Sequence, residues 1–183
     1  MKCKNYKNVT NNFINNNNHG CVKIYKDLSY YQYKNKKYYI DGKHIMYSFD
    51  ENEDVFAIWL YNIIHKDIIL LPKINYPERI KSADYRIGNK YYDLKTIYGN
   101  SNQVLYHKIR RSIGQANRFI FDIQSTCSLS LNDLEEQINK IFSSSRYDCI
   151  FVDMILLRYM DNLYVYKKLT APGVKSPGQS VHT

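Results

Sequence analysis

Cysteine, proline and glycine are scarce in this chain, at 4, 4 and 7 of 183 residues. The cysteines, Cys3, Cys21, Cys127 and Cys149, stand far apart and form no Cys-x-x-Cys pair. Neither a zinc knuckle nor a disulfide framework is therefore indicated, and a reducing compartment is the expected environment. No glycine-rich loop of the kind that cradles phosphates is present either.

Long apolar runs are also missing. No run reaches the length of about 20 residues that a membrane-spanning helix needs. Residues 1–18 are basic and asparagine-rich and lack the apolar segment of a secretory signal. We therefore expect a cytoplasmic site of action, with no signal peptide, and delivery to another cell only by a separate system.

Histidines in catalytic or metal-binding patterns are absent as well. The five histidines are dispersed, and none has a ligand spacing such as His-Glu-x-x-His. A serine or cysteine nucleophile with a histidine base consequently has no support from the sequence.

The chain is instead rich in positive charge and tyrosine. Its 26 lysines and arginines outnumber 17 acidic residues, which gives a net charge of +9 and a pI near 9.2. This balance favours a polyanionic partner, above all nucleic acid, and the 19 tyrosines offer surfaces on which bases can stack. A merely lysine-rich surface on a soluble protein is the alternative explanation.

The length predicts one domain with its own core. We expect a flexible, asparagine-rich lead over residues 1–20, a single domain over 21–169 whose core spans about 50–166, and a flexible tail over 170–183. Alternating residues predict a small N-terminal β accessory, with a strand at Val22–Tyr25 and a hairpin around Asp41-Gly42.

The core reads as helix, strand, two-stranded hairpin, helix, strand, helix, strand, strand. Asp50 and Glu53 form a capping box before apolar residues at helical spacing, which predicts a helix over Glu51–His65. The remaining elements follow from short apolar runs, periodicity and caps. They are strand Ile68–Leu71, helix Val104–Asn117, strand Phe119–Ile123, a helix capped by Ser130, and strands Cys149–Leu156 and Leu163–Tyr166, the last at the sheet edge.

The hairpin of Ala83–Ile87 and Lys90–Thr96 carries the most informative pattern. Its Gly88-Asn89 turn pairs Ile87 with Lys90 and Tyr85 with Tyr92, which sets Asp84 opposite Asp93. Facing carboxylates repel one another, and the period of two puts Lys95 on the same face as Asp93. A divalent cation between the aspartates, beside a lysine, is machinery for phosphodiester hydrolysis. Solvated strand-end charges, with Asp93 paired to Lys95, are the structural alternative.

This ordered pattern resembles the PD-(D/E)xK, or restriction-endonuclease-like, nucleases. It is most similar to the C-terminal tRNA-nuclease toxin domains of contact-dependent growth inhibition (CdiA) proteins. The resemblance covers roughly residues 42–166, and Ala83 stands where the motif has proline. It rests on Glu53, the strand before Pro72, Asp84, Asp93-Leu94-Lys95 and Gly114-Gln115-Ala116. It implies an α/β (α+β) fold in which helices flank a central mixed β-sheet.

The resemblance assigns a role to each site residue. Asp84, Asp93 and Glu53 are the expected metal ligands, with Mg²⁺ or Mn²⁺ favoured over Zn²⁺ because carboxylate oxygens are hard donors. Lys95 is expected to stabilise charge on the phosphate, and Gln115 to orient water or a carboxylate. Glu53 alternatively serves only the capping box, with Glu51 and Glu78 as replacement ligands, and Gln115 alternatively only ends its helix.

Basic residues near these motifs are candidates for contact with phosphates. The principal candidates are Arg86, Lys108 and Arg111, followed by Arg79, Lys81 and Arg110. For each of them a solvated surface charge is the alternative.

The sequence thus predicts a metal-dependent nuclease, an RNase or tRNase toxin in the first instance, with DNA as a second substrate and an immunity protein as a partner. Two alternatives stay open. One is a metal-independent RNase toxin that works by acid-base chemistry on the ribose 2′-hydroxyl. The other is a non-catalytic basic module that binds nucleic acid.

Overall fold

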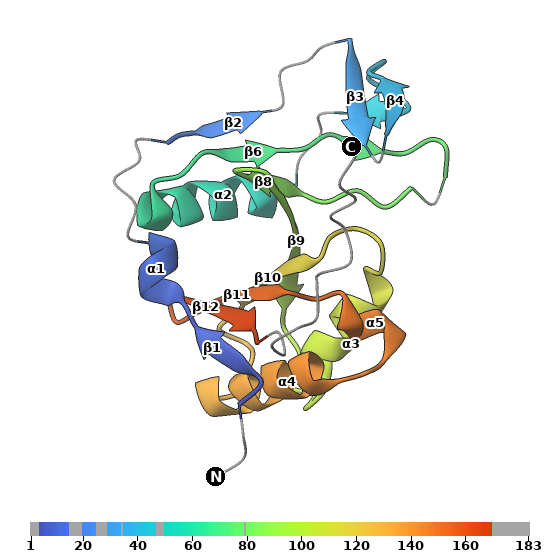
Figure 1. Cartoon of the computed structure of the whole chain (residues 1–183). Coiled ribbons are helices and arrows are strands. Elements are labelled where there is room, and N and C mark those ends of the chain that lie inside the picture. Colours follow the sequence, from blue (N-terminus) through green and yellow to red (C-terminus); the bar gives the residue numbers. More distant parts are fainter. Residues whose placement is uncertain are drawn as a thin grey trace, which may run out of the picture.

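The computed structural model describes residues 4–14, 20–24, 29–33, 35–46, 50–78 and 80–169. Its centre is an eight-stranded mixed sheet in the order β1-β12-β11-β10-β9-β8-β6-β2, which helices flank as predicted (Figure 1). In chain order its strands are β1 (Tyr6–Asn8), β2 (Val22–Ile24), β6 (Ile68–Leu70), β8 (Tyr85–Ile87), β9 (Lys90–Ile97), β10 (Arg118–Ile123), β11 (Met154–Tyr159) and β12 (Asn162–Lys168).

The helices are α1 (Thr10–Ile14), α2 (Glu51–Ile64), α3 (Val104–Arg111), α4 (Leu131–Ser143) and α5 (Tyr147–Ile150). The predicted caps are confirmed for the two longest. Asp50 and Glu53 form a capping box at the start of α2, and Ser130 caps α4 together with Asp133. These caps satisfy backbone N–H groups that have no partner within the first helical turn.

Two apolar layers hold the helices on the sheet. On one face α2 buries Phe56, Ala57 and Leu60 against residues such as Leu94 and Ile120. On the other face, residues of α3, α4 and α5 pack on Ile97, Phe119 and Phe121. Because successive strand residues alternate between faces, Asp93 and Lys95 lie on the α3 face, with Ile97.

The predicted hairpin register is confirmed from Tyr85 paired with Tyr92 to Ile87 paired with Lys90. The strands β9, β10 and β11 run parallel, whereas β8 is antiparallel to β9 and to β6. β8 begins at Tyr85, opposite Tyr92 of β9, and β9 to β11 continue past this point.

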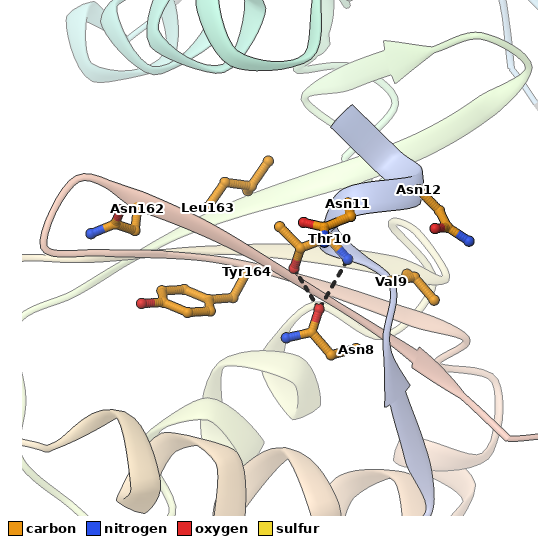
Figure 2. A pocket seen from close by; sticks show the side chains of 8 residues that line it. All are labelled: Asn8, Val9, Thr10, Asn11, Asn12, Asn162, Leu163 and Tyr164. Atoms are coloured by element: carbon orange, nitrogen blue, oxygen red, sulfur yellow. Dashed lines mark hydrogen bonds between the residues drawn. The ribbon is translucent and has the colours of Figure 1, made fainter. Parts of the chain in front are cut away.

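The described part of the N-terminal segment differs from the flexible lead expected for residues 1–20. β1 pairs with β12, and Tyr6 is buried with its ring edge-on to Tyr166 at 5.2 Å. Figure 2 shows α1 following β1 beside β12, where the Thr10 N–H and hydroxyl donate to the Asn8 side chain at 2.9 and 2.6 Å. β12 is consequently not the edge strand that the sequence predicts, because β1 covers it.

The β accessory is also arranged differently. The strand predicted at Val22–Tyr25 is present as β2 but joins the main sheet, parallel to β6. The predicted hairpin around Asp41-Gly42 is wrong, because β3 (Tyr30–Tyr33) pairs with β4 (Lys36–Tyr39) and β5 (Ile45–Met46) pairs with β7 (Lys73–Ile74). The Asp41 carboxylate instead accepts the N–H groups of the following turn, from Lys43 to Ile45.

Two other boundaries of helices and strands differ from those that the sequence predicts. The predicted strand at Cys149 begins only at Met154, because Tyr147–Ile150 forms the helical turn α5 and buries Cys149 against α3 and α4. α3 ends at Arg111, six residues before the predicted end, and the turn after it uses Gly114 at φ 89°. The predicted tail, residues 170–183, lies outside the described residues.

Within the described part of the chain, no helix is both long enough and apolar enough to span a membrane.

Candidate active site

Asp84 stands where the pairing of β8 with β9 stops. Its backbone N–H donates to the Tyr92 carbonyl at 3.0 Å, and its side-chain Oδ2 accepts the Leu94 N–H at 2.7 Å. The carboxylate thereby takes the place of a ladder partner for β9. This bond holds Asp84 near Asp93, although the ladder itself ends at Tyr85 and Tyr92 and does not pair the two aspartates.

Asp93 and Lys95 form an ion pair on β9. Asp93 is fully buried, and Lys95 Nζ lies 2.9 Å from its Oδ1 and 2.8 Å from its Oδ2. The Lys95 side chain keeps 21% of its surface exposed. The pair therefore joins a fully buried carboxylate to a lysine whose side chain stays partly exposed to solvent.

The two aspartates are electrostatically coupled. Burial, followed by the charge of Asp93, raises the pKa of Asp84 to about 7. Burial likewise raises the pKa of Asp93, against the opposing effect of Lys95. Because two neighbouring carboxylates repel each other, one proton stabilises the pair when no cation is bound.

Ser112 is a member of the site that the sequence reasoning missed. It is the C-cap of α3, is 2% exposed, and forms a side-chain hydrogen bond with Asp93 that lowers the pKa of this aspartate. One signal was available: Ser112 continues the buried row of Leu105 and Ile109 at helical spacing. A polar residue in an apolar row needs a polar partner inside the fold.

Glu53 lies near these carboxylates but is engaged elsewhere. Its Oε2 accepts the Asp50 N–H at 3.3 Å, and its Oε1 pairs with Lys73 Nζ at 2.8 Å. Burial raises the pKa of Glu53, Lys73 lowers it, and the charge of Asp84 raises it further. Among the described residues, no three His, Cys, Asp or Glu side chains form a group that could hold a metal ion.

The other predicted residues take several positions. Gln115 lies in the turn after α3, and its N–H donates to the Ser112 carbonyl at 3.0 Å. Glu51 and Glu78, the replacement ligands, are exposed. Of the basic candidates, Arg86 and Lys108 are half-buried and Arg111 is exposed, with its carbonyl accepting Lys81 Nζ at 2.6 Å. Arg79 lies outside the described residues.

The donor set fits a divalent cation in part. Asp84 and Asp93 present hard oxygen donors, and their mutual repulsion is the kind that a cation relieves. Glu53 is the nearest further carboxylate whose charge interacts with Asp84. Asp84 and Asp93 are thus suited to bind the ion, and Glu53 would have to leave Lys73 to join them.

Two cavities, each of about 510 Å³, lie outside this cluster. The one in Figure 2 is lined by Asn8, Val9, Thr10, Asn11, Asn12, Asn162, Leu163 and Tyr164. None of these residues is a carboxylate, histidine, lysine or arginine, so this cavity has none of the groups on which the site's chemistry depends. The other cavity lies at the start of α2 and is taken up below.

Part of the chain matches a protein-family model. Residues 81–158 match the family described as contact-dependent growth inhibition CdiA C-terminal domain. The matched segment includes Asp84, Asp93, Lys95, Ser112 and Gln115, but not Glu53.

One solved structure that the chain matches is the CdiA-CT/CdiI toxin and immunity complex from Burkholderia pseudomallei. The match has a TM-score of 0.49 at 21% sequence identity and covers 63% of this chain and 82% of the other. No curated protein matches the chain.

Proposed function

We propose that this protein is a nuclease toxin that hydrolyses phosphodiester bonds with the help of a divalent metal ion. One observation carries the proposal: a fully buried aspartate, coupled to a second aspartate, is paired with a solvent-accessible lysine. Such an arrangement costs folding free energy, which is typical of a functional site. The match of the surrounding segment to the CdiA C-terminal domain supports the same class of activity.

Each residue of the site has a proposed role that follows from its position. Asp84 and Asp93 would hold the cation, which supplies an activated water and neutralises phosphate charge when bound. Lys95, reachable from solvent, donates to a phosphate oxygen and offsets the negative charge that develops there. The Ser112 hydrogen bond keeps Asp93 oriented and favours its charged form.

RNA, and tRNA in particular, is the substrate we favour, with DNA as the second candidate. The net charge of +9 suits either polyanion, and only the likeness to CdiA toxin domains favours tRNA. A toxin of this kind acts in the cytoplasm of a target cell, and the producing cell would need an immunity protein that blocks access to Lys95.

The test is incubation of the purified protein with total RNA and plasmid DNA, with Mg²⁺, Mn²⁺ or Zn²⁺ and with EDTA. We expect cleavage that EDTA abolishes and that Asp93→Asn or Lys95→Ala lowers by about 10²-fold or more. Asp153→Asn and Lys90→Ala are matched controls, because they change an aspartate paired with an arginine and an exposed lysine at the start of β9.

Three outcomes would contradict the proposal. One is absence of cleavage under every metal, and another is full activity of both site variants. Cleavage that persists in EDTA and leaves 2′,3′-cyclic phosphate ends would favour a metal-independent RNase instead.

A further inference from the structure

The second cavity lies between the start of α2 and the ends of β10 and β11. It has a volume of about 510 Å³, within the range of small-molecule sites. Its polar lining comes from Asn52, Asp122, Gln124, Ser125, Arg158 and Asp161. None of these residues belongs to the proposed catalytic set, so the nuclease chemistry does not explain the cavity.

Asp122 is the distinctive group in this cavity. It is only 8% exposed and lies on β10 in a row with Thr96 of β9 and Arg158 of β11. Gln124 Nε2 donates to its Oδ2 at 2.7 Å, whereas Arg158 Nε is 3.7 Å from its Oδ1. Arg158 lies closer to Asp161, at 2.8 Å. Asp122 therefore remains a buried acceptor whose charge is only loosely compensated.

The cavity adjoins the candidate active site. Asn52, in its wall, directly precedes Glu53 in the first turn of α2. The Tyr85 hydroxyl, at the start of β8, donates to the Glu53 carbonyl at 2.7 Å. The cavity therefore lies on the α2 face of the sheet beside Glu53, whereas Asp93 and Lys95 lie on the α3 face.

We propose that this cavity binds a guanine base of the nucleic-acid substrate. The inference rests on the proposed function for the identity of the substrate. It adds a base-recognition site, and hence a cleavage preference, that the catalytic residues do not provide.

Guanine is the base whose hydrogen-bonding edge fits the lining. Its N1–H and N2–H₂ groups stand side by side, and a carboxylate such as Asp122 can accept from both. Its O6 is an acceptor for the Arg158 guanidinium or the Asn52 amide. Adenine and cytosine offer one donor group on that edge, beside acceptors that a carboxylate repels.

Arg158 also connects the cavity to a fluorescent side chain whose emission can report binding. Its guanidinium carbon lies 4.7 Å from the centre of the Trp59 ring, and Trp59 is the only tryptophan of the chain. A base that contacts Arg158 changes the surroundings of this ring. Intrinsic fluorescence therefore measures occupancy without reference to cleavage.

The experiment titrates the metal-free protein with guanosine 5′-monophosphate and, as the matched ligand with the same phosphate, adenosine 5′-monophosphate. We expect saturable quenching by the guanine nucleotide and binding of the adenine nucleotide at least about tenfold weaker. Asp122→Asn should weaken guanine binding by about tenfold or more. Gln124→Ala leaves the buried carboxylate in place but removes the amide that donates to it, and it should also weaken guanine binding. The control Asp153→Asn changes a half-buried, arginine-paired aspartate at the opposite end of β10 and β11.

Equal binding of the two nucleotides, or unchanged guanine binding in both Asp122→Asn and Gln124→Ala, would overturn the inference. Asp93→Asn should bind the guanine nucleotide like the parent while it cleaves nothing, which separates the two proposals. A parent protein that prefers guanine but cleaves no nucleic acid supports the pocket and defeats the nuclease. Cleavage without guanine preference, in binding or in mapped cut sites, defeats the pocket alone.

Discussion

At the scale of single residues, the cost of burying Asp93 dominates the site. A fully buried carboxylate is tolerated only with hydrogen bonds and an opposite charge, and Asp93 has Lys95 and Ser112, although its Oδ2 has no well-aligned hydrogen-bond donor among the described residues. These partners hold the side chain in place before any ligand binds. Such preorganisation is what electrostatic catalysis requires.

The coupled pair predicts an unusual dependence of stability on pH. The pKa values of Asp84 and Asp93 are raised on folding, so the folded state holds a proton that the unfolded chain releases. The stability from that proton is complete below about pH 4 and is lost as the pH rises through about 7. In EDTA at pH 8, Asp84→Asn should therefore be more stable than the parent by about 1–3 kcal/mol.

Urea unfolding of both proteins at several pH values measures this difference. It should shrink toward pH 4, where the parent pair is protonated, and adding Mg²⁺ at pH 8 should stabilise the parent more than the variant. Asp153→Asn serves as the control. An advantage of Asp84→Asn that does not change with pH would show that the aspartates are not coupled.

At the scale of elements, β1 closes the edge of the sheet. It covers β12 with an antiparallel ladder from Tyr6–Lys168 to Asn8–Tyr166. Tyr6 also packs in the core formed with α4, through Phe142 and Tyr166. This segment is thus part of the domain, although its composition resembles that of a linker.

Replacing Tyr6 tests the role of β1. Tyr6→Ala removes a ring that is 6% exposed and should lower the free energy of unfolding by about 3 kcal/mol. Lys7→Ala, an exposed change on the same strand, should have little effect. Chemical denaturation of both variants provides the comparison, and equal stability would mean that β1 adds nothing to the fold.

At the scale of the whole molecule, the excess of positive charge should govern how nucleic acid is bound. Lysine and arginine contacts with phosphates release counterions, so affinity falls linearly with salt on logarithmic axes. α3 carries Lys108, Arg110 and Arg111 in its last turn, directly before Ser112. We expect this turn to contact the substrate backbone next to the cleavage site.

Binding of RNA by the inactive Asp93→Asn protein, measured over a range of salt concentrations, tests this expectation. Lys108→Gln and Arg111→Gln should each reduce the slope by about 1 and weaken different sequences equally. Lys140→Gln, an exposed lysine in the last turn of α4, is the matched control. If the slope is unchanged by the α3 variants, α3 does not contact the phosphates.

Local sequence signals were sufficient for the hairpin and for most of the core order. The Gly88-Asn89 turn sets the register by itself, and the caps at Asp50 and Ser130 place two helix starts, because each depends only on neighbouring residues. Asp84, Asp93 and Lys95 follow from that register, since one hairpin carries all three. These signals are short-range, so they can be recognised without the rest of the fold.

Only the tertiary structure decided which residues of other elements contact one another around this hairpin and at the sheet edge. The position of Ser112 against Asp93, the pairing of Glu53 with Lys73, and the edge position of β1 join residues 19 to 162 positions apart. The cavity around Asp122 likewise needs α2, β10 and β11 together. Such contacts depend on the burial of whole elements against one another, and a local pattern can mark a residue such as Ser112 as buried but does not identify its partner.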